Sequence, residues 1–521
     1  MKAREKNRSS RQKREGQTKW ADLLDVKIDP RLSVSIARQI YQQLQEAIIS
    51  TTLPAGSRLP STRKFSERIR VSRTSVVAAY SELLAEGYIE GRRGSGTFIA
   101  AQLPSLARSR SNFVMIDEGA AGRRLSELGA RYRGMAGDAA ALSDQPFSAG
   151  RCSIDLPTIE AWRQISARHA RSIPTDVLGY GDPFGRESFR EVIAEYLRAF
   201  RSVNCTAGQI IVTSGAQQAI DLSLRVLLNP GEPVWVENPG YPALQNALRA
   251  ANSIMIPVPV DERGIVVDVG LEKEPRPRAI FVTPSHQYPT GAVMAIERRR
   301  ELLQAAAKAD AWILEDDYDS EFRYAGHPLP SLQGLDRSSR VIYIGTLSKV
   351  LFPGLRTGFA VIPLDLVDAY RGARYLSDRG PPIAHQGVLE EFMREGFFTS
   401  HIRRMRQHYR TVLETVIADL RAALGSLAVI KMPECGMRFV AYLADGLDDV
   451  AVARAAARRG VVVRPISPLY LDGIGQAGID IGFTGFNPRL MQIAAVRLGE
   501  AVREVAAGLQ GIPIEARRPR P

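Results

Sequence analysis

The stretch Val341-Ile342-Tyr343-Ile344-Gly345-Thr346-Leu347-Ser348-Lys349 determines how the larger part of this chain is interpreted. Its first four residues are β-branched or aromatic, which predicts a buried strand. The strand runs into a turn of small residues that presents Lys349, and Arg356 follows seven residues later. A lysine that leaves a buried strand between hydroxyl groups and an arginine is what a pyridoxal 5'-phosphate (PLP) site requires.

The chemistry of that site explains the pattern. A lysine amine forms a Schiff base with the aldehyde of PLP, while hydroxyl groups and a planar guanidinium hold its phosphate. The run Thr346-Leu-Ser-Lys349, followed by Pro353-Gly-Leu-Arg356, resembles the cofactor-lysine region of class I (fold-type I) aminotransferases. The resemblance implies that Lys349 carries the Schiff base and that Thr346, Ser348 and Arg356 contact the phosphate.

Strand-like and helical runs alternate over residues 146–521, which predicts an α/β fold with a mostly parallel sheet. In such sheets, ligands bind beyond the carboxyl ends of the strands. The strands are expected at Gln209–Thr213, Pro233–Glu237, Ser253–Val258, Ala279–Thr283, Trp312–Glu315, Arg340–Ile344 and Phe359–Ile362. The residues that carry chemistry fall at those ends.

Three further runs follow predicted strands. Residues 214–217 open a helix whose free N–H groups suit a phosphate, and Tyr241 can stack on a flat ring. Asp316 can pair with the pyridine nitrogen and keep it protonated, while Tyr318 can donate to the phenolate oxygen of the ring. The resemblance to class I aminotransferases, over about residues 146–505, implies cofactor roles for Gly215, Ala216, Gln217, Tyr241, Asp316 and Tyr318.

Charge is distributed unevenly along the chain. Residues 1–100 hold 19 Lys+Arg and 10 Asp+Glu, which is +9 of the net +13. This asymmetry predicts a nucleic-acid-binding end joined to a nearly neutral body. The three scattered cysteines favour reduced thiols over a disulfide framework or a metal cluster. Since we also find no apolar run of membrane-spanning length and no signal peptide, we expect a cytoplasmic protein.

The basic end is expected to contain an arm and a compact domain. Residues 1–33 predict a disordered basic arm. Within residues 34–100, helical spacing predicts a first helix over 35–50, and Ser61 and Ser72 suit the caps of two more. Residues 88–99 are typical of a strand, a basic glycine turn and a strand. The core face expected for the third helix is Val76, Val77, Tyr80, Leu83 and Leu84.

A helix, a helix-turn-helix and a β-wing in this order resemble the winged helix-turn-helix domain of the GntR family. The residues that carry the resemblance are Arg58-Leu-Pro-Ser-x-Arg63, Val71-Ser-Arg-Thr74, Leu84-x-x-Glu-Gly87 and Gly94-x-Gly-Thr-Phe98. Side chains at the start of a recognition helix reach base edges, and nearby arginines meet phosphates or the minor groove. The expected contacts to a double-stranded DNA operator are Arg63, Arg73, Thr74, Ser75, Arg92, Arg93 and Gly94.

Residues 101–145 are rich in Ala, Ser, Gly and Arg, which predicts a flexible linker. A GntR-like domain followed by an aminotransferase-like domain resembles the MocR/GabR subfamily of GntR-type regulators. That resemblance implies a domain-swapped homodimer in which each DNA-binding domain packs on the body of the partner. It also implies an effector, either PLP itself or another amino compound, that is sensed through the cofactor.

Two functions are compatible with these motifs: a PLP-dependent transcription regulator, and an active aminotransferase with an accessory DNA-binding domain. Departures from the enzyme pattern favour the regulator. Aminotransferases usually have Asn-Pro-Thr-Gly where this chain has Tyr288-Pro-Thr-Gly. They also carry an arginine that clamps the substrate carboxylate where this chain has Gly478-Ile-Asp-Ile-Gly-Phe483. Arg438 and Arg464 are the candidates for replacing that clamp.

Overall fold

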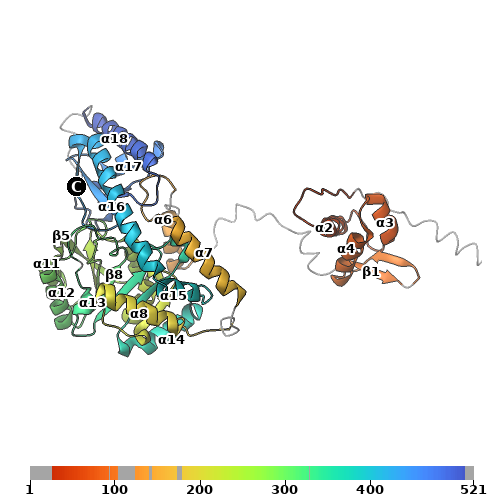
Figure 1. The fold of residues 1–521 in the computed structure, drawn as a ribbon, viewed down its shortest axis with the longest axis horizontal. Helices are drawn as coiled ribbons and strands as arrows, with labels where there is room; N and C mark the ends of the chain where they lie inside the picture. The colour runs from red at the N-terminus through yellow and green to blue at the C-terminus, as the bar shows by residue number, and fades with distance from the viewer. Residues whose placement is uncertain are drawn as a thin grey trace, which may run out of the picture. The chain divides into compact units, whose positions relative to one another are not determined.

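The computed structural model describes residues 26–92, 94–103, 124–139, 144–172, 179–327 and 329–510. Contacts divide the chain into two compact units, and the division falls between Arg124 and Leu125. Figure 1 labels the elements of each unit. Among the described residues, no helix is both long and apolar enough to cross a membrane.

The first unit is built from three helices and a hairpin. Each helix begins directly after a capping serine, whose hydroxyl accepts a backbone N–H of the first turn. The capping serines are Ser35, Ser61 and Ser72. The strands pair antiparallel. The elements are α2 (Ile36–Ile49), α3 (Thr62–Ile69), α4 (Arg73–Ala85), β1 (Ile89–Arg92) and β2 (Gly96–Ile99).

The buried face of α4 differs from the predicted one at two positions. Val76, Tyr80 and Leu83 are buried as expected, but Val77 is 41% exposed and Leu84 is 51% exposed. Ala79 is buried instead. The buried positions recur at i, i+3, i+4 and i+7, which form one stripe along the helix. Val77 and Leu84 each come one residue after a position of this stripe, so the turn of the helix points them away from the core.

An eight-stranded sheet forms the centre of the second unit, in the order β3-β10-β9-β8-β7-β4-β5-β6. Neighbours pair parallel except at β10, which is antiparallel to β3 and β9, and at β6. This confirms the α/β class with a mostly parallel sheet. The strands are β3 (Ile210–Thr213), β4 (Pro233–Asn238), β5 (Ile254–Asp261), β6 (Gly264–Ile265), β7 (Ala279–Val282), β8 (Trp312–Asp317), β9 (Val341–Thr346) and β10 (Gly358–Val361).

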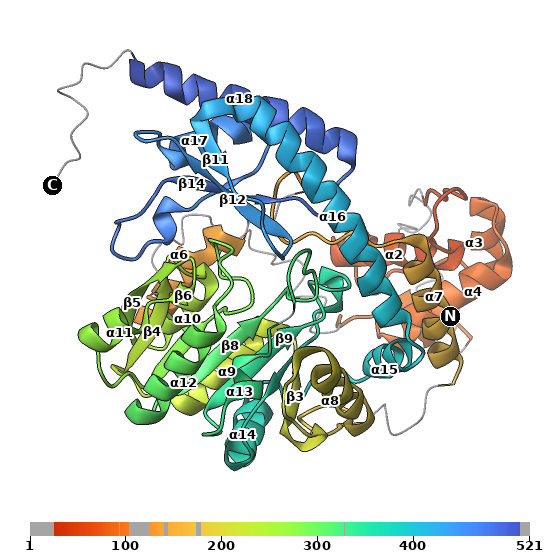
Figure 2. The same ribbon diagram turned by 60° about the vertical axis from the view of Figure 1, so that its left-hand side comes forward.

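Helices surround this sheet (Figure 2). They are α7 (Leu156–Arg171), α8 (Glu187–Arg201), α9 (Ala216–Leu227), α10 (Pro242–Ala250), α11 (Val267–Lys273), α12 (Ile296–Ala309), α13 (Leu332–Leu335), α14 (Val367–Asp378) and α15 (Gln386–Arg394). Because β3 and β4 each lead into a helix, the starts of α9 and α10 lie at the carboxyl ends of those strands.

A smaller antiparallel sheet of order β11-β12-β14-β13 follows. The long helix α16 runs from this sheet down to α7 and α15 (Figure 2), and it packs along α18. Residues of both sheets and of α16 belong to one buried cluster, so the second unit has a continuous core. These elements are α16 (Phe397–Leu424), β11 (Ala428–Ile430), β12 (Arg438–Leu443), α17 (Asp449–Arg458), β13 (Arg464–Pro465), β14 (Gly478–Gly482) and α18 (Pro488–Gln510).

The range expected to be a flexible linker, residues 101–145, contains a helix, α6 (Glu127–Ala139). Arg131 fixes it to the end of α10: its Nη1 donates to the Arg249 carbonyl at 2.9 Å and to the side chain of Asn252. These contacts hold α6 against the body, whereas the flexibility expected for the rest of the range stays a prediction. Most of the predicted basic arm lies outside the described residues.

Candidate cofactor site

Lys349 lies in the turn that leaves β9, half-buried. Burial lowers the pKa of its amine, which favours the neutral form that attacks a carbonyl. Gly150 has φ +96°, and a side-chain carbon there would lie only 2.7 Å from Lys349 Nζ. A loop therefore passes against the amine, and its positive φ at Gly150 favours glycine there. Sequence reasoning missed Gly150, since a single glycine in an irregular segment gives no signal.

The start of α9 and Arg356 lie together. Gly215, at φ +94°, is the residue before the helix, and a side-chain carbon there would lie 3.2 Å from Arg356 Nη2. The same nitrogen donates to the Ser214 carbonyl at 3.0 Å. The N–H groups of Ala216 and Gln217 in the first turn of α9, next to a guanidinium, are suited to an anion such as a phosphate.

Two predicted hydroxyl groups border this anion site. Thr346 Oγ1 accepts the backbone N–H of Ser348 at 3.1 Å. Both hydroxyls also approach the carbonyl of Thr357, at 3.3 and 3.4 Å. Since Thr357 directly follows Arg356, the structure brings the four predicted phosphate contacts, from α9, Thr346, Ser348 and Arg356, to one end of the sheet.

Asp316 and Tyr241 are placed to hold a ring. Asp316 is buried in β8, and its Oδ1 has no hydrogen-bond partner among the described residues. Burial, with the negative charges of Asp317, Asp319 and Glu237, raises its pKa to about 7. An unpartnered buried carboxyl oxygen fits the protonated nitrogen of PLP. Tyr241 follows β4, and its ring meets that of Tyr288 edge-on, with centroids 5.5 Å apart.

Tyr318 has a partner that sequence reasoning did not anticipate. Its hydroxyl lies 3.2 Å from His286 Nδ1, and the same nitrogen is 3.0 Å from both oxygens of Asp319. The histidine is buried against Gly436, where a side-chain carbon would lie 1.9 Å from the ring. His286 and Asp319 thus fix the tyrosine expected at the phenolate oxygen. The only signal in the sequence for His286 and Asp319 was that both residues lie in runs that follow predicted strands.

The two arginines considered as a carboxylate clamp already have partners. Arg438 is buried and pairs with Asp480 at 2.8 Å. Its guanidinium stacks on the Tyr288 ring, with Cζ 3.8 Å from the centroid. Arg464 Nη1 donates to the Tyr288 hydroxyl at 3.0 Å. Asp480 therefore balances the charge of Arg438, and Arg464 is held by the Tyr288 hydroxyl.

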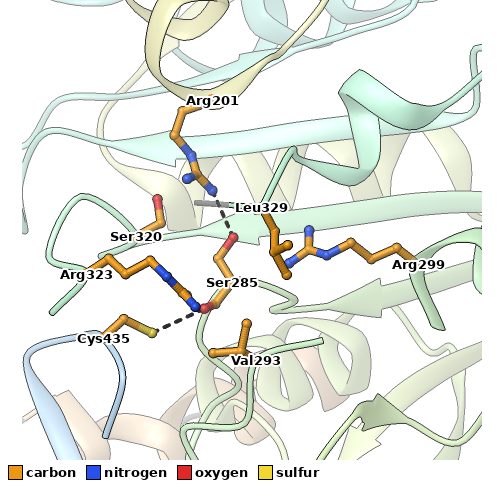
Figure 3. Close-up of a pocket in the computed structure, with 8 residues that line it drawn as sticks. All are labelled: Arg201, Ser285, Val293, Arg299, Ser320, Arg323, Leu329 and Cys435. Atoms are coloured by element: carbon orange, nitrogen blue, oxygen red, sulfur yellow. Dashed lines mark hydrogen bonds between the residues drawn. The ribbon is translucent and has the colours of Figure 1, made fainter. Parts of the chain in front are cut away.

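A small hollow lies near this region but contains none of the predicted cofactor residues (Figure 3). Ion pairs occupy its three arginines: Arg201 with Asp317 at 2.6 Å, Arg323 with Glu434 at 2.7 Å, and Arg299 with Glu315 at 3.9 Å. We interpret it as a structural polar layer. Its lining is Arg201, Ser285, Val293, Arg299, Ser320, Arg323, Leu329 and Cys435.

In the first unit, the predicted DNA contacts differ in accessibility. Arg73 and Thr74 are exposed at the start of α4, as a reading helix requires. Ser75 is half-buried, and its hydroxyl lies 3.0 Å from the capping hydroxyl of Ser72. Arg63 is exposed on α3 and pairs with Glu67 at 3.2 Å. The Ser75 hydroxyl is therefore engaged with the capping residue Ser72, and this contact competes with a contact to DNA.

The wing is described only in part. Arg92 lies over the Phe98 ring, 4.6 Å from its centroid, and pairs with Glu90 at 2.6 Å. Gly94 has φ +71°, which suits a tight turn. Arg93 lies outside the described residues.

Comparisons with known proteins match both units. Residues 146–497 match the family aminotransferase class I and II, and residues 36–99 match bacterial regulatory proteins of the gntR family. The probable rhizopine catabolism regulatory protein MocR of Rhizobium meliloti is 39% identical over 468 residues, 89% of this chain and 93% of the relative. The pyridoxine biosynthesis transcriptional regulator PdxR of Corynebacterium glutamicum is 31% identical over 488 residues, 92% and 98% of the two chains.

A solved structure is similar to the second unit. It is the α-aminoadipate aminotransferase LysN of Thermus thermophilus, complexed with N-(5'-phosphopyridoxyl)-L-leucine, at a TM-score of 0.65 and 28% identity. The match covers 70% of this chain and 93% of that one.

Proposed function

The chain belongs to the MocR-type transcription regulators, in which a gntR-type DNA-binding domain precedes a class I and II aminotransferase domain, and we propose that it controls DNA binding by sensing an amine at PLP. When bound, PLP supplies an aldehyde that condenses with primary amines. Lys349 would hold the cofactor until an effector amine takes its place. PLP itself is the alternative signal.

One observation supports sensing over turnover: the cofactor residues are intact, while Arg438, one of the two candidate clamp arginines, is paired with Asp480. Lys349, Asp316 and Arg356 have the burial and surroundings that PLP requires. Asp480, however, neutralises Arg438. An active aminotransferase with an accessory DNA-binding domain explains the first fact but not the second, and the regulators named above match nearly the whole chain.

A mechanical route from the ring to the linker supports regulation. Helix α10 begins directly after Tyr241, and the linker helix α6 is fixed to its far end by Arg131. A change in the ring that Tyr241 contacts would therefore shift α10 and, through Arg249, the linker that leads to the DNA-binding domain. Such a shift alters DNA affinity only if the effector binds the two arrangements unequally.

The same proposal includes the cellular setting and the assembly. We propose a cytoplasmic, domain-swapped homodimer in which each DNA-binding domain packs on the body of the partner. The proposed operator contacts are Arg63, Arg73, Thr74, Ser75, Arg92, Arg93 and Gly94, of which the exposed Arg73 and Thr74 are best placed to contact bases.

The visible absorption spectrum of the purified protein with PLP tests the cofactor part. We expect a band of lysine-linked PLP in the wild type and none in Lys349→Ala. Amines that bind at the cofactor should shift that band. Equal spectra from the two proteins would contradict the proposed role of Lys349.

A further inference from the structure

Three polar side chains meet beside the cofactor residues, beyond the carboxyl ends of two neighbouring strands. Strands β7 and β8 pair parallel, so the residues that follow them lie at one edge of the sheet. His286 follows β7, and Tyr318 and Asp319 follow β8. The histidine and the aspartate are 2% and 1% exposed, so the contact between them is shielded from water.

Backbone on two sides leaves the imidazole ring little room to turn. A side-chain carbon at Gly436 would lie 1.9 Å from His286 Cε1 and 2.2 Å from Nδ1, and one at Gly291 would lie 3.3 Å from Nε2. In this enclosed position, Nδ1 lies 3.0 Å from both carboxylate oxygens of Asp319. The same nitrogen lies 3.2 Å from the Tyr318 hydroxyl.

These distances determine which nitrogen of the ring carries a proton. The Asp319 carboxylate only accepts hydrogen bonds, and its Oδ2 already accepts the Met437 N–H at 3.0 Å. A lone pair on Nδ1 would face both carboxylate oxygens at 3.0 Å and would be repelled by them. We therefore assign a proton to Nδ1, which donates to Asp319 and shares its hydrogen with the Tyr318 oxygen.

The tyrosine hydroxyl must then donate to another group. Because Nδ1 carries a hydrogen, the Tyr318 oxygen accepts from it and cannot donate to it. Burial and the negative charge of Asp319 raise the pKa of Tyr318, which keeps the hydroxyl protonated. Its proton is left for an acceptor such as the phenolate oxygen of PLP. The charged and titratable groups around this hydroxyl are His286, Asp319, Cys435, Arg438 and Asp480.

Resting on the function proposed above, we infer that His286 is a positioning residue, which together with Asp319 directs the Tyr318 proton to the phenolate oxygen of PLP. The negative charge on that oxygen holds the proton of the neighbouring nitrogen, through which Lys349 is linked to PLP. A donor at the oxygen weakens this hold. Since that proton makes the adjoining carbon attractive to amines, His286 regulates the pH range in which the site responds to an effector.

A pH titration of the visible band of lysine-linked PLP tests the inference on the PLP-loaded, full-length protein. His286→Leu removes the Nδ1 donor and should raise the midpoint by at least about one pH unit, the size of one hydrogen bond to a charged group. His286→Asn should keep the wild-type midpoint, because the asparagine amide nitrogen is bonded to Cγ as Nδ1 is. The matched control is His169→Leu, which removes a histidine–carboxylate contact between α7 and α15 and should change nothing.

Tyr318→Phe separates positioning from a general structural effect. It removes the hydroxyl that His286 directs, so it should raise the midpoint at least as much as His286→Leu does. In the Tyr318→Phe protein, His286→Leu should add no further shift. A further shift as large as in the wild type would overturn the inference, because the histidine would then act without the tyrosine.

A second measurement needs neither PLP nor a folded leucine variant. In the cofactor-free wild type with isotope-labelled histidine, nitrogen NMR shows which ring nitrogen of His286 carries a proton. The signal that disappears in His286→Asn identifies this residue among the six histidines. A proton on Nδ1 supports the inference, and a proton on Nε2 alone would overturn it.

The outcomes separate this inference from the function on which it rests. Equal midpoints in the wild type and in His286→Leu would overturn the inference and leave amine sensing intact. A midpoint raised as much by His286→Asn as by His286→Leu would overturn it equally. A wild type without a visible band would refute the cofactor site of the proposed function, and this inference with it.

Discussion

Replacing Asp316 by asparagine should stabilise the cofactor-free protein at high pH, although it should weaken PLP binding. The folded protein raises the pKa of this buried carboxyl from its ordinary 3.8 to about 7, chiefly because burial disfavours the charged form. An acid whose pKa is raised on folding makes the folded state less stable as pH rises from 3.8 toward 7. Below that window both states are protonated, and the penalty vanishes.

The size of this effect follows from the two pKa values. At about 1.4 kcal/mol per pH unit, the full penalty above pH 7 is about 4 kcal/mol. At pH 5 about 2 kcal/mol of it has developed, so the advantage of Asp316→Asn should grow by about 2 to 3 kcal/mol between pH 5 and pH 8. The constant cost of burying an asparagine amide does not affect this growth.

Urea unfolding of the cofactor-free proteins at pH 5, 6.5 and 8, followed by tryptophan fluorescence, measures the effect. Three of the four tryptophans, Trp162, Trp235 and Trp312, lie in the second unit, and replacing Trp20 by phenylalanine in every variant leaves a signal that reports the body. The control Asp221→Asn, which removes an exposed partner of Arg225 on α9, should show no growth with pH. A stability difference between Asp316→Asn and wild type that stays constant from pH 5 to pH 8 would refute the assignment of Asp316 as a carboxyl kept neutral by burial.

The remaining predictions concern the amine, the phosphate, the linker and the DNA. Gly150→Ala should reduce the visible band of lysine-linked PLP, since a methyl group would lie 2.7 Å from Lys349 Nζ and displace the amine. Gly446→Ala, at a glycine of similar φ with open space around it, should keep the band. Arg356→Gln should weaken PLP binding at least about tenfold by calorimetry, as loss of a charge-assisted bond implies, and an unchanged affinity would exclude Arg356 from the phosphate site. Arg131→Ala should keep the effector-induced shift of the band but reduce its effect on DNA affinity; an unchanged effect would refute the α6–α10 route. Arg73→Ala should lower specific DNA binding by about 1 to 3 kcal/mol in a fluorescence anisotropy titration, and retained specificity would contradict α4 as the reading helix.

Much of the fold was predictable because local chemistry and burial agree. The strand that ends before Lys349 is apolar throughout, and the capping serines of the first unit stand where the helices begin. The antiparallel insertion of β10 between β3 and β9 was not predictable, since a strand's direction is set by its connections and not by its composition. The contact of helix α6 with α10 was not predictable for a related reason: the two helices are far apart in the sequence.

In the cofactor site too, local sequence predicted the residues themselves but not their long-range partners. Lys349, Arg356, Asp316 and Gly215 could be named because each lies at or beyond the carboxyl end of a strand and has the chemistry that PLP needs. The partners of those groups could not, since His286 meets Tyr318 only through the fold. The absence of a clamp arginine was visible in the sequence, but the pairing of Arg438 with Asp480 across two strands required the structure.

The most direct test of the central claim is the affinity of the PLP-loaded, full-length protein for a DNA fragment selected in vitro, measured with and without an amine that shifts the visible band. Wild type and Lys349→Ala should be compared on the same fragment. The account predicts that the amine changes the DNA affinity of the wild type and leaves that of Lys349→Ala unchanged. The same amine-induced change in both proteins, or none in the wild type, would contradict control of DNA binding through Lys349.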